Sequence, residues 1–115
     1  MTSDTFERLV HPELDRAAAL FDALAHPVRL RIVCGLLDGG CCVGPMVECL
    51  GLPQAFVSRH LAILRSAGVV ASVTEGRTRV YRVVDPLVPP LVALLCAELA
   101  PHRSPPAPRA EEASP

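Results

Sequence analysis

The stretch from Leu50 to Asp85, LGLPQAFVSRHLAILRSAGVVASVTEGRTRVYRVVD, decides the fold of this chain. Pro53 suits the start of a helix, because its fixed backbone angle is already helical and its missing N–H has no helical partner to lose there. After it, Val57, Leu61 and Leu64 recur at helical spacing and form one apolar stripe. The first half of the stretch therefore predicts a helix with one face that packs and another that is open to a partner.

The second half of the stretch predicts a β-hairpin. Gly68 ends the helix, because glycine readily adopts the left-handed conformation that closes one. Glu75-Gly76 supplies the turn between two runs that are rich in β-branched residues. The first run contains Val69, Val70 and Val73. The second run interleaves cations with apolar residues, namely Arg77, Arg79 and Arg82 with Val80, Tyr81 and Val83.

Positive charge is concentrated in this stretch rather than spread over the chain. Between Gln54 and Arg82 there are five arginines and one glutamate, a net charge of +4, whereas the whole chain of 115 residues carries −1. Phosphate contacts depend on the local field, so a mildly acidic protein with one cationic face can still bind DNA. We expect the helix residues to approach the groove and the hairpin residues to contact the backbone or the minor groove. The predicted DNA-binding residues are Gln54, Ala55, Ser58, Arg59, His60, Arg65, Arg77 and Arg79.

Four segments together resemble the ArsR/SmtB family of winged-helix repressors. They are LAHPVRLRIVCGLL from Leu24, VGPMVECLGL from Val43, PQAFVSRHLAILRSAGVV from Pro53 and EGRTRVYRVVD from Glu75. They cover most of residues 20–86 in the family's order. The resemblance implies a homodimer that places two recognition helices in successive major grooves of an inverted repeat, about 34 Å apart by duplex geometry. It also implies repression that an effector relieves.

The chain is predicted to be mainly α-helical, with five helices and one hairpin wing in a winged helix-turn-helix domain over residues 1–100. The four other helices are expected at Pro12–Ala25, from Pro27 to the Gly39-Gly40 pair, at Val43–Leu50 and at Leu87–Leu99. Pro89 and Pro90 are expected to confine the regular part of the last helix to later residues. Residues 101–115 are rich in proline and charge, which predicts a disordered tail.

The two ends of the domain carry more apolar residues than the central unit needs for its own core. These lie in Leu14–Leu24 and Leu87–Leu99. A chain of this length buries a modest fraction of its surface, so a second subunit would help to stabilise it. We therefore expect both segments to form the interface of a homodimer.

Several classes of protein do not fit the sequence. No apolar run approaches the ~20 residues that span a bilayer, and the start MTSDTFERL lacks a cationic, hydrophobic signal region, so we expect a cytoplasmic protein that does not bind membranes. There is no Gly-rich phosphate loop, no HExxH and no nucleophile elbow. The four histidines, His11, His26, His60 and His102, lack ligand or acid–base spacing. We expect no enzyme activity, no catalytic residue and no required cofactor.

The first of two candidate sensing sites pairs Cys34 with Cys96. Each lies on an apolar stripe of a different predicted helix, which is also where two core cysteines would lie. The resemblance to the reactive-sulfur and redox sensors of the family implies that an oxidant joins the two thiols and lowers DNA affinity. Cys34 matches the LRIVC position of those sensors, and Cys96 lies about one helical turn, roughly 5 Å, earlier than their second cysteine. This pair is the preferred interpretation.

The alternative site uses Cys41 and Cys42, with Cys34, Cys49 or the other subunit as a further source of ligands. Adjacent thiols before a short helix feel its N-terminal dipole, which favours the thiolate that binds As(III), Sb(III), Cd(II) or Pb(II). Metalloid sensors of the family bind here through Cys-Val-Cys, whereas this chain has Cys42-Val43-Gly44. Cys49 follows Cys42 by seven residues, about 10 Å along a helix, and is more simply a core residue beside Met46.

A constitutive winged-helix regulator with purely structural cysteines is the remaining alternative. A zinc site on the last helix is not expected, because Glu98 is its only charged residue between Leu87 and Leu99. The sequence thus predicts a DNA-binding repressor and leaves the effector open between oxidant or reactive sulfur, a soft metalloid, and none.

Overall fold

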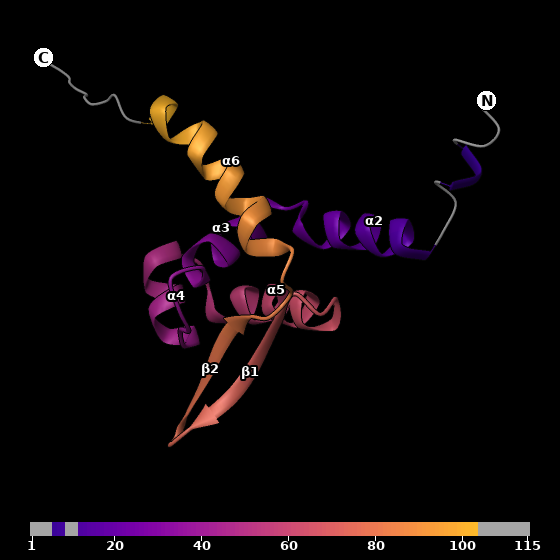
Figure 1. Ribbon diagram of the computed structural model, residues 1–115. Coiled ribbons are helices and arrows are strands. Elements are labelled where there is room, and N and C mark those ends of the chain that lie inside the picture. The colour runs from indigo at the N-terminus through magenta and orange to yellow at the C-terminus, as the bar shows by residue number, and fades with distance from the viewer. Residues whose placement is uncertain (1–5, 9–11, 104–115) are drawn as a thin grey trace, which may run out of the picture. The chain divides into compact units, whose positions relative to one another are not determined.

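The computed structural model describes residues 6–8 and 12–103 (Figure 1). Over these residues the chain is mainly α-helical with one antiparallel hairpin, as predicted. The elements in chain order are α2 (Pro12–Leu24), α3 (Pro27–Leu36), α4 (Val43–Leu50), α5 (Gln54–Ser66), β1 (Val70–Glu75), β2 (Thr78–Val83) and α6 (Val88–Arg103). A short helical segment at residues 6–8 precedes α2. Two compact units result, Met1–Asp85 and Pro86–Pro115, and α6 belongs to the second.

Helix α3 begins where His26 caps it. The His26 backbone is extended, and its Nδ1 accepts a hydrogen bond from the backbone N–H of Val28 at 3.1 Å. Pro27 occupies the first turn, where its missing N–H costs nothing. The helix ends at Leu36, before the predicted Gly39-Gly40 stop, because Leu37 already acts as its C-cap. Helix α2 ends one residue earlier than predicted.

Helices α4 and α5 form the helix–turn–helix pair. The bounds of α4 match the prediction, and Gly51 closes it in the left-handed conformation with a φ of 66°. Pro53 is the N-cap of α5 and not its first helical residue, because its ψ of 145° is extended. After α5, Gly68 adopts a φ of 79°, which confirms the predicted left-handed stop and turns the chain into β1.

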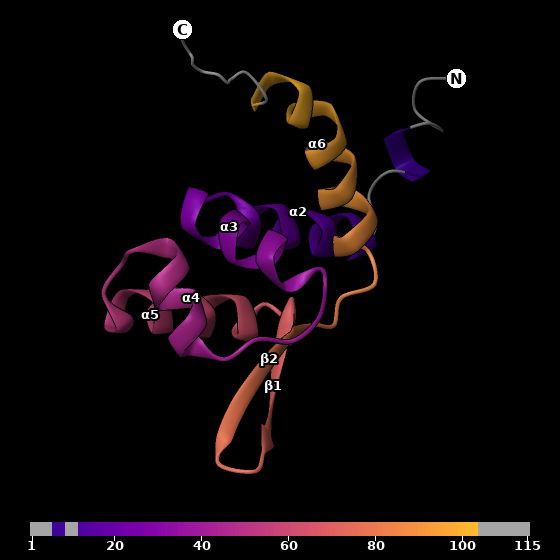
Figure 2. The same cartoon turned by 90° about the vertical axis from the view of Figure 1, so that its left-hand side faces the viewer.

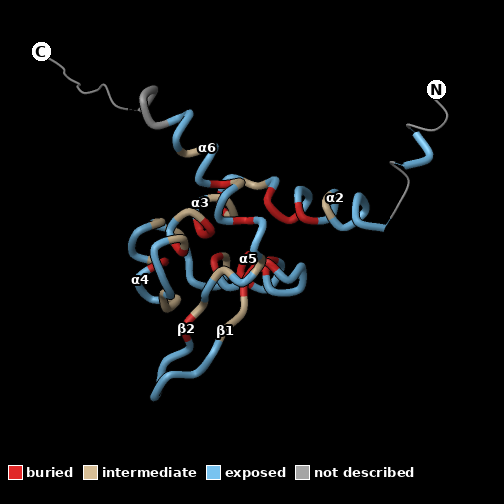
Figure 3. Tube along the Cα trace, in the orientation of Figure 1, coloured by how far each residue is buried: buried red, intermediate tan, exposed pale blue. Residues whose placement is uncertain are grey.

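The hairpin formed by β1 and β2, here called the wing, extends away from α4 and α5 (Figure 2). Its register pairs Val70 with Val83 at the base and Glu75 with Thr78 at the tip, so the turn lies at the predicted place. The base is buried, with Val70 2% and Val80 8% exposed, whereas the tip is in solvent (Figure 3). The wing therefore holds its base in the core and presents its tip to a partner.

The core of the first unit lies among α3, α5 and the start of β1. The predicted stripe of α5 is confirmed, because Val57, Leu61 and Leu64 are at most 1% exposed. They pack with α3 and with β1, and both Val33 of α3 and Val69, just before β1, are 0% exposed. Burial of this stripe therefore determines which face of α5 points to solvent.

Helix α6 differs from its prediction at both ends. Pro89 and Pro90 lie in its first turn rather than before its regular part, because prolines are tolerated there. At the other end the helix continues to Arg103, past the predicted boundary at residue 101. The rest of the predicted tail, residues 104–115, lies outside the described residues. Among the described residues, no helix is long and apolar enough to cross a membrane.

Gly40 packs so closely against the wing that a methyl group there would collide with it. An added Cβ would lie 2.5 Å from Cγ1 of Val80 and 2.8 Å from Cζ of Arg82. Because valine is stiff at χ1, we expect Gly40→Ala to lower the free energy of unfolding by about 1 to 3 kcal/mol. Gly44→Ala is the matched control, because a Cβ there meets nothing within 4 Å.

Urea unfolding of the two variants beside the parent protein measures this difference. Equal stability of Gly40→Ala and Gly44→Ala would show that the loop moves away from β2 at no cost. That result would contradict a tight contact between the loop and the wing.

Candidate nucleic-acid interface

The solvent face of α5 carries most of the residues predicted to bind DNA. Gln54, Ala55, Ser58 and Arg59 are all exposed near its N-terminus, on the face opposite the buried stripe. The Cζ atom of the Arg59 guanidinium lies 6.0 Å from the ring centroid of Phe56, which is a long cation–π contact. Arg65 is also exposed and lies in the last turn of α5. These side chains are available to a duplex without any change in α5.

His60 does not belong to this surface, and its assignment to the DNA-binding set was wrong. The residue is only 6% exposed and lies among the buried residues of α5. The reason is its spacing, because His60 falls three residues after Val57 and four before Leu64, within the apolar stripe. That spacing is visible in the sequence and could have placed it in the core.

His60 instead joins three elements through a polar cluster with Arg29 and His26. Nη1 of Arg29 lies 3.2 Å from Nδ1 of His60, and the two imidazole rings are 4.4 Å apart between centroids. The same guanidinium donates to the main-chain oxygens of Ala23 and Asp22, which end α2. Arg29 therefore ties the end of α2 and the buried side of α5 to α3. The sequence reasoning missed this role, although arginine donors suit helix C-termini.

The cluster holds His60 in its neutral form. Burial lowers the pKa of His60 below the ordinary value of 6.5, and the nearby His26, Arg29 and Arg59 lower it further. A guanidinium can only donate, so Nδ1 of His60 must be the acceptor in its contact with Arg29. Protonation at Nδ1 would place two donors against each other beneath the exposed face of α5.

We expect stability to fall in acid because of His60. A lowered pKa in the folded state means that the unfolded chain binds the proton more readily. The contribution of His60 is therefore complete above pH 6.5 and is lost as the pH falls from there toward the lowered pKa of the folded state. His60→Asn is the comparison, because its amide oxygen can accept from Arg29 without titrating.

Urea unfolding at pH 7.5 and at pH 5.0 tests this expectation. The parent protein should lose more stability between these two conditions than His60→Asn. Parallel losses would mean that His60 remains neutral at both pH values or is easily solvated when charged.

The wing supplies the second cationic surface. Arg77 lies at the tip and Arg79 beside it opposite Thr74, and both are exposed. Arg82 differs, because its Nη2 lies 3.4 Å from Oε2 of Glu75. The carboxylate of Glu75 therefore offsets the positive charge of Arg82. Arg77 and Arg79 are therefore the wing cations available to phosphate.

A loop residue forms an isolated antiparallel bridge with the wing. The N–H of Cys41 donates to the main-chain oxygen of Tyr81 at 3.0 Å, and the N–H of Tyr81 donates back at 2.9 Å. The chain that leads into α4 is thus bonded to β2. This long-range bridge has no local sequence pattern, and the sequence reasoning did not find it.

The cysteines fall into two groups. Cys34 is half-buried in α3 of the first unit and Cys96 is half-buried in α6 of the second, and their pairing stays a prediction. Cys41 and Cys42 precede α4, and Cys42 is its N-cap. Within residues 6–8 and 12–103, no three side chains of His, Cys, Asp or Glu gather in a group that could hold a metal ion.

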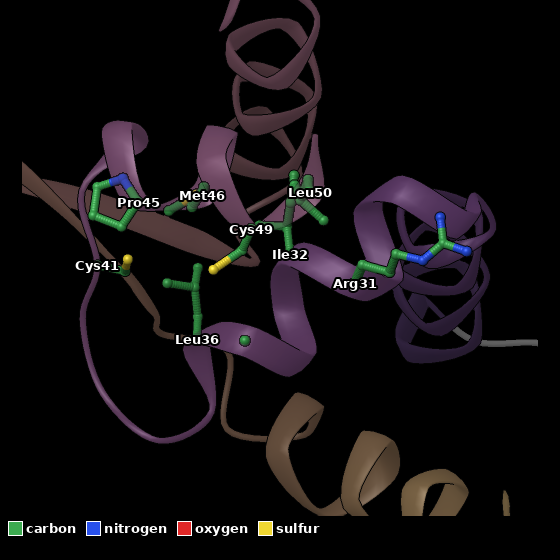
Figure 4. Close-up of a pocket in the computed structure, with 9 residues that line it drawn as sticks. Arg31, Ile32, Leu36, Cys41, Pro45, Met46, Cys49 and Leu50 are labelled. Carbon is green, nitrogen blue, oxygen red and sulfur yellow. The ribbon is translucent and has the colours of Figure 1, made fainter. Parts of the chain in front are cut away.

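Cys49 is not the core residue that its position beside Met46 predicted, because it is exposed whereas Met46 is buried. It lines a small cavity of about 150 Å³ between α3 and α4, and Cys41 lines the same cavity (Figure 4). Cys42 does not line it. Of the two cysteines before α4, it is therefore Cys41 that shares this cavity with Cys49.

Comparison with known proteins agrees with this geometry. Residues 26–72 match the family described as "Bacterial regulatory protein, arsR family". The chain is 30% identical over 106 residues to the biofilm growth-associated repressor of Xylella fastidiosa, which covers 85% of this chain and 93% of that protein. The chain belongs to the ArsR family. The predicted resemblance is confirmed.

The chain is also similar to two further proteins. It is 47% identical over 72 residues to the transcriptional repressor SmtB of Mycobacterium tuberculosis, a match that covers 63% of this chain and 53% of SmtB. The chain thus spans about half the length of SmtB. The structure of HlyU from Vibrio cholerae aligns with a TM-score of 0.75 at 33% identity, covering 79% of this chain and 99% of HlyU. SmtB and the biofilm growth-associated protein are both named as repressors and not as enzymes.

Proposed function

We propose that this ArsR-family chain is a transcriptional repressor that binds duplex DNA through α5 and the wing. The observation that carries the proposal is the pair of exposed cationic surfaces, Arg59 on α5 and Arg77 with Arg79 on the wing tip. The rest of the chain has an excess of negative charge, so an anionic duplex is drawn to this side of the first unit. In this assignment α5 enters the major groove and the wing contacts the adjacent backbone.

The repressor acts as a homodimer on an inverted repeat in this proposal. Both α2 and α6 expose large apolar side chains, among them Phe21 at 57%, Leu94 at 62% and Leu99 at 58%. A second copy of the chain is the partner with matching apolar faces, and a two-fold axis would present two copies of α5 to the DNA.

Thiol chemistry is the proposed release mechanism, with Cys34 and Cys96 as the reacting pair. Cys34 is half-buried in α3, the helix that carries Arg29 and packs on α5. A persulfide would convert the two thiols to a disulfide and leave as a thiol and hydrogen sulfide, so its outer sulfur takes up both electrons. A structure described as reduced HlyU from Vibrio cholerae, at 35% identity and a TM-score of 0.71, supports the proposal that the redox state of this chain is relevant.

Operator binding by the reduced protein, titrated with an organic persulfide, tests the release mechanism. The duplex is an inverted repeat selected from a random pool, and intact mass is recorded on each sample. We expect a Cys34–Cys96 link, a mass loss of two hydrogens and a fall in affinity of about tenfold, within the usual range of coupling between sites. Cys34→Ser should keep its affinity after the same treatment, and Cys42→Ser is the matched control that should still respond.

A second arm of the same titration uses As(III) in place of persulfide. Release by As(III) with Cys41 and Cys42 protected from alkylation would favour the metalloid alternative. Binding that ignores both reagents would contradict thiol sensing and support a constitutive repressor.

A further inference from the structure

The cavity between α3 and α4 combines a small volume with apolar walls and sulfur (Figure 4). Ile32 and Leu36 of α3 face Pro45 and Met46 of α4 across it, and Cys41 and Cys49 supply two thiols. Arg31 also contributes to the wall, but its guanidinium points away from the cavity in Figure 4. The site is therefore poorly suited to an ion and well suited to an uncharged apolar molecule.

The volume limits the size of such a molecule. A cavity of about 150 Å³ is the size that holds benzene in an apolar protein core. The apolar walls disfavour small ions, and the small volume excludes nucleotides. The occupant is thus a single small ring or a short chain without charge.

The two thiols differ in how available they are. Cys41 is half-buried, and its Sγ donates a hydrogen bond to the main-chain oxygen of Cys42 at 3.4 Å. Cys49 is exposed and lines the cavity from the last turn of α4. A molecule that enters the cavity therefore meets Cys49 as its accessible nucleophile.

From these features we propose that the cavity is a receptor for small α,β-unsaturated carbonyl compounds, which Cys49 captures covalently. The sulfur of Cys49 bonds to the β-carbon of the alkene while the carbon–carbon π bond breaks. The thiol proton ends on the α-carbon, so the product is a thioether and no oxidant or reductant is consumed. Ile32, Leu36 and Met46 hold the carbon skeleton during the reaction.

The position of the cavity connects an adduct to both DNA-binding elements. Cys41 forms one wall and is bonded through its backbone to Tyr81 of the wing. Helix α4 forms another wall and packs against α5. An adduct that spreads α3 from α4 would therefore displace the wing and α5 together and weaken DNA binding, a consequence that rests on the proposed function.

The test uses the reduced 115-residue chain and 2-cyclohexenone, a six-membered ring of about benzene size. Adducts are located by intact mass and peptide mapping over a range of concentrations. We expect the rate at Cys49 to saturate and to exceed the rate at Cys42 by about tenfold, equivalent to roughly 1.4 kcal/mol of selective binding. Cyclohexanone, which has the same ring but no alkene, should compete and slow the reaction at Cys49.

Two variants separate binding in the cavity from simple exposure of a thiol. Gly35→Ala should slow capture, because Gly35 lines the cavity and a Cβ there meets no neighbour within 4 Å, so the variant folds. Cys49→Ser should abolish the adduct. A rate at Cys49 that rises linearly, ignores cyclohexanone and is unchanged in Gly35→Ala would overturn the proposal.

Duplex binding is measured separately on the modified and unmodified protein. If an adduct forms at Cys49 but the unmodified protein binds no duplex, the proposed function is contradicted. The proposal that the cavity captures these compounds would still stand. If the unmodified protein binds the duplex and the adduct binds it with the same affinity, the proposed effect of the adduct on the wing and α5 is contradicted.

Discussion

Replacing both Arg77 and Arg79 by alanine is expected to weaken duplex binding by on the order of a hundredfold at low salt. Both side chains are exposed at the wing tip, whereas Arg82 forms an ion pair with Glu75. Each phosphate contact contributes about 0.9 to the slope of log affinity against log salt, so each wing should lose about two units of slope. Specific and nonspecific duplexes should lose affinity alike, because phosphate contacts carry no sequence information.

Fluorescence anisotropy with a labelled duplex at about 50 to 300 mM salt measures both the affinity and its salt slope. The charge-matched control replaces Arg16 of α2 and Arg31 of α3, two exposed arginines that lie outside the cationic stretch. The control should keep the slope of the parent protein. An unchanged slope in the wing variant would mean that the wing does not contact phosphate.

Leu64→Ala is expected to lower the free energy of unfolding by about 2 to 5 kcal/mol, a large share of the stability of a small domain. Leu64 is 0% exposed and lies on the buried stripe of α5, where alanine would leave a cavity. Ile63→Ala is the control on the same helix, because Ile63 is 39% exposed and its loss removes less buried surface. Duplex binding by Leu64→Ala should fall with stability, since the same helix presents Arg59.

Urea unfolding of both variants gives the two free energies at one temperature and pH. Similar losses for Leu64→Ala and Ile63→Ala would contradict the orientation of α5. The face now assigned to DNA would then have to carry part of the core.

The features that could be predicted from the sequence are those fixed by local chemistry. The spacing of Val57, Leu61 and Leu64 identified the buried side of α5, and Glu75-Gly76 located the turn of the wing. The cationic residues of the wing followed from strand alternation. In each case a single periodicity or turn preference decides the structure, and the tertiary contacts agree with it.

The features that were missed depend on residues far apart in the chain. His60 was predicted to bind DNA, although its spacing lies within the buried stripe and its polar partner, Arg29, is 31 residues away in the chain. The bridge between Cys41 and Tyr81 and the cavity shared by Cys41 and Cys49 arise only when α4 packs beside β2 and α3. Two helix starts that involve proline were also misplaced, because Pro53 can precede a helix and Pro89 can lie inside the first turn of one.

Selection of duplexes from a random pool by the reduced parent protein tests the central claim most directly. The selection is repeated with Arg59→Ala, which removes an exposed cation from α5 and leaves the wing intact. The account predicts an enriched inverted repeat with half-sites about one helical turn, 10 to 10.5 base pairs, apart, and an altered half-site with Arg59→Ala. Recovery of no enriched sequence, or of the same sequence by both proteins with undiminished affinity, would contradict the assignment of α5 as the element that reads DNA.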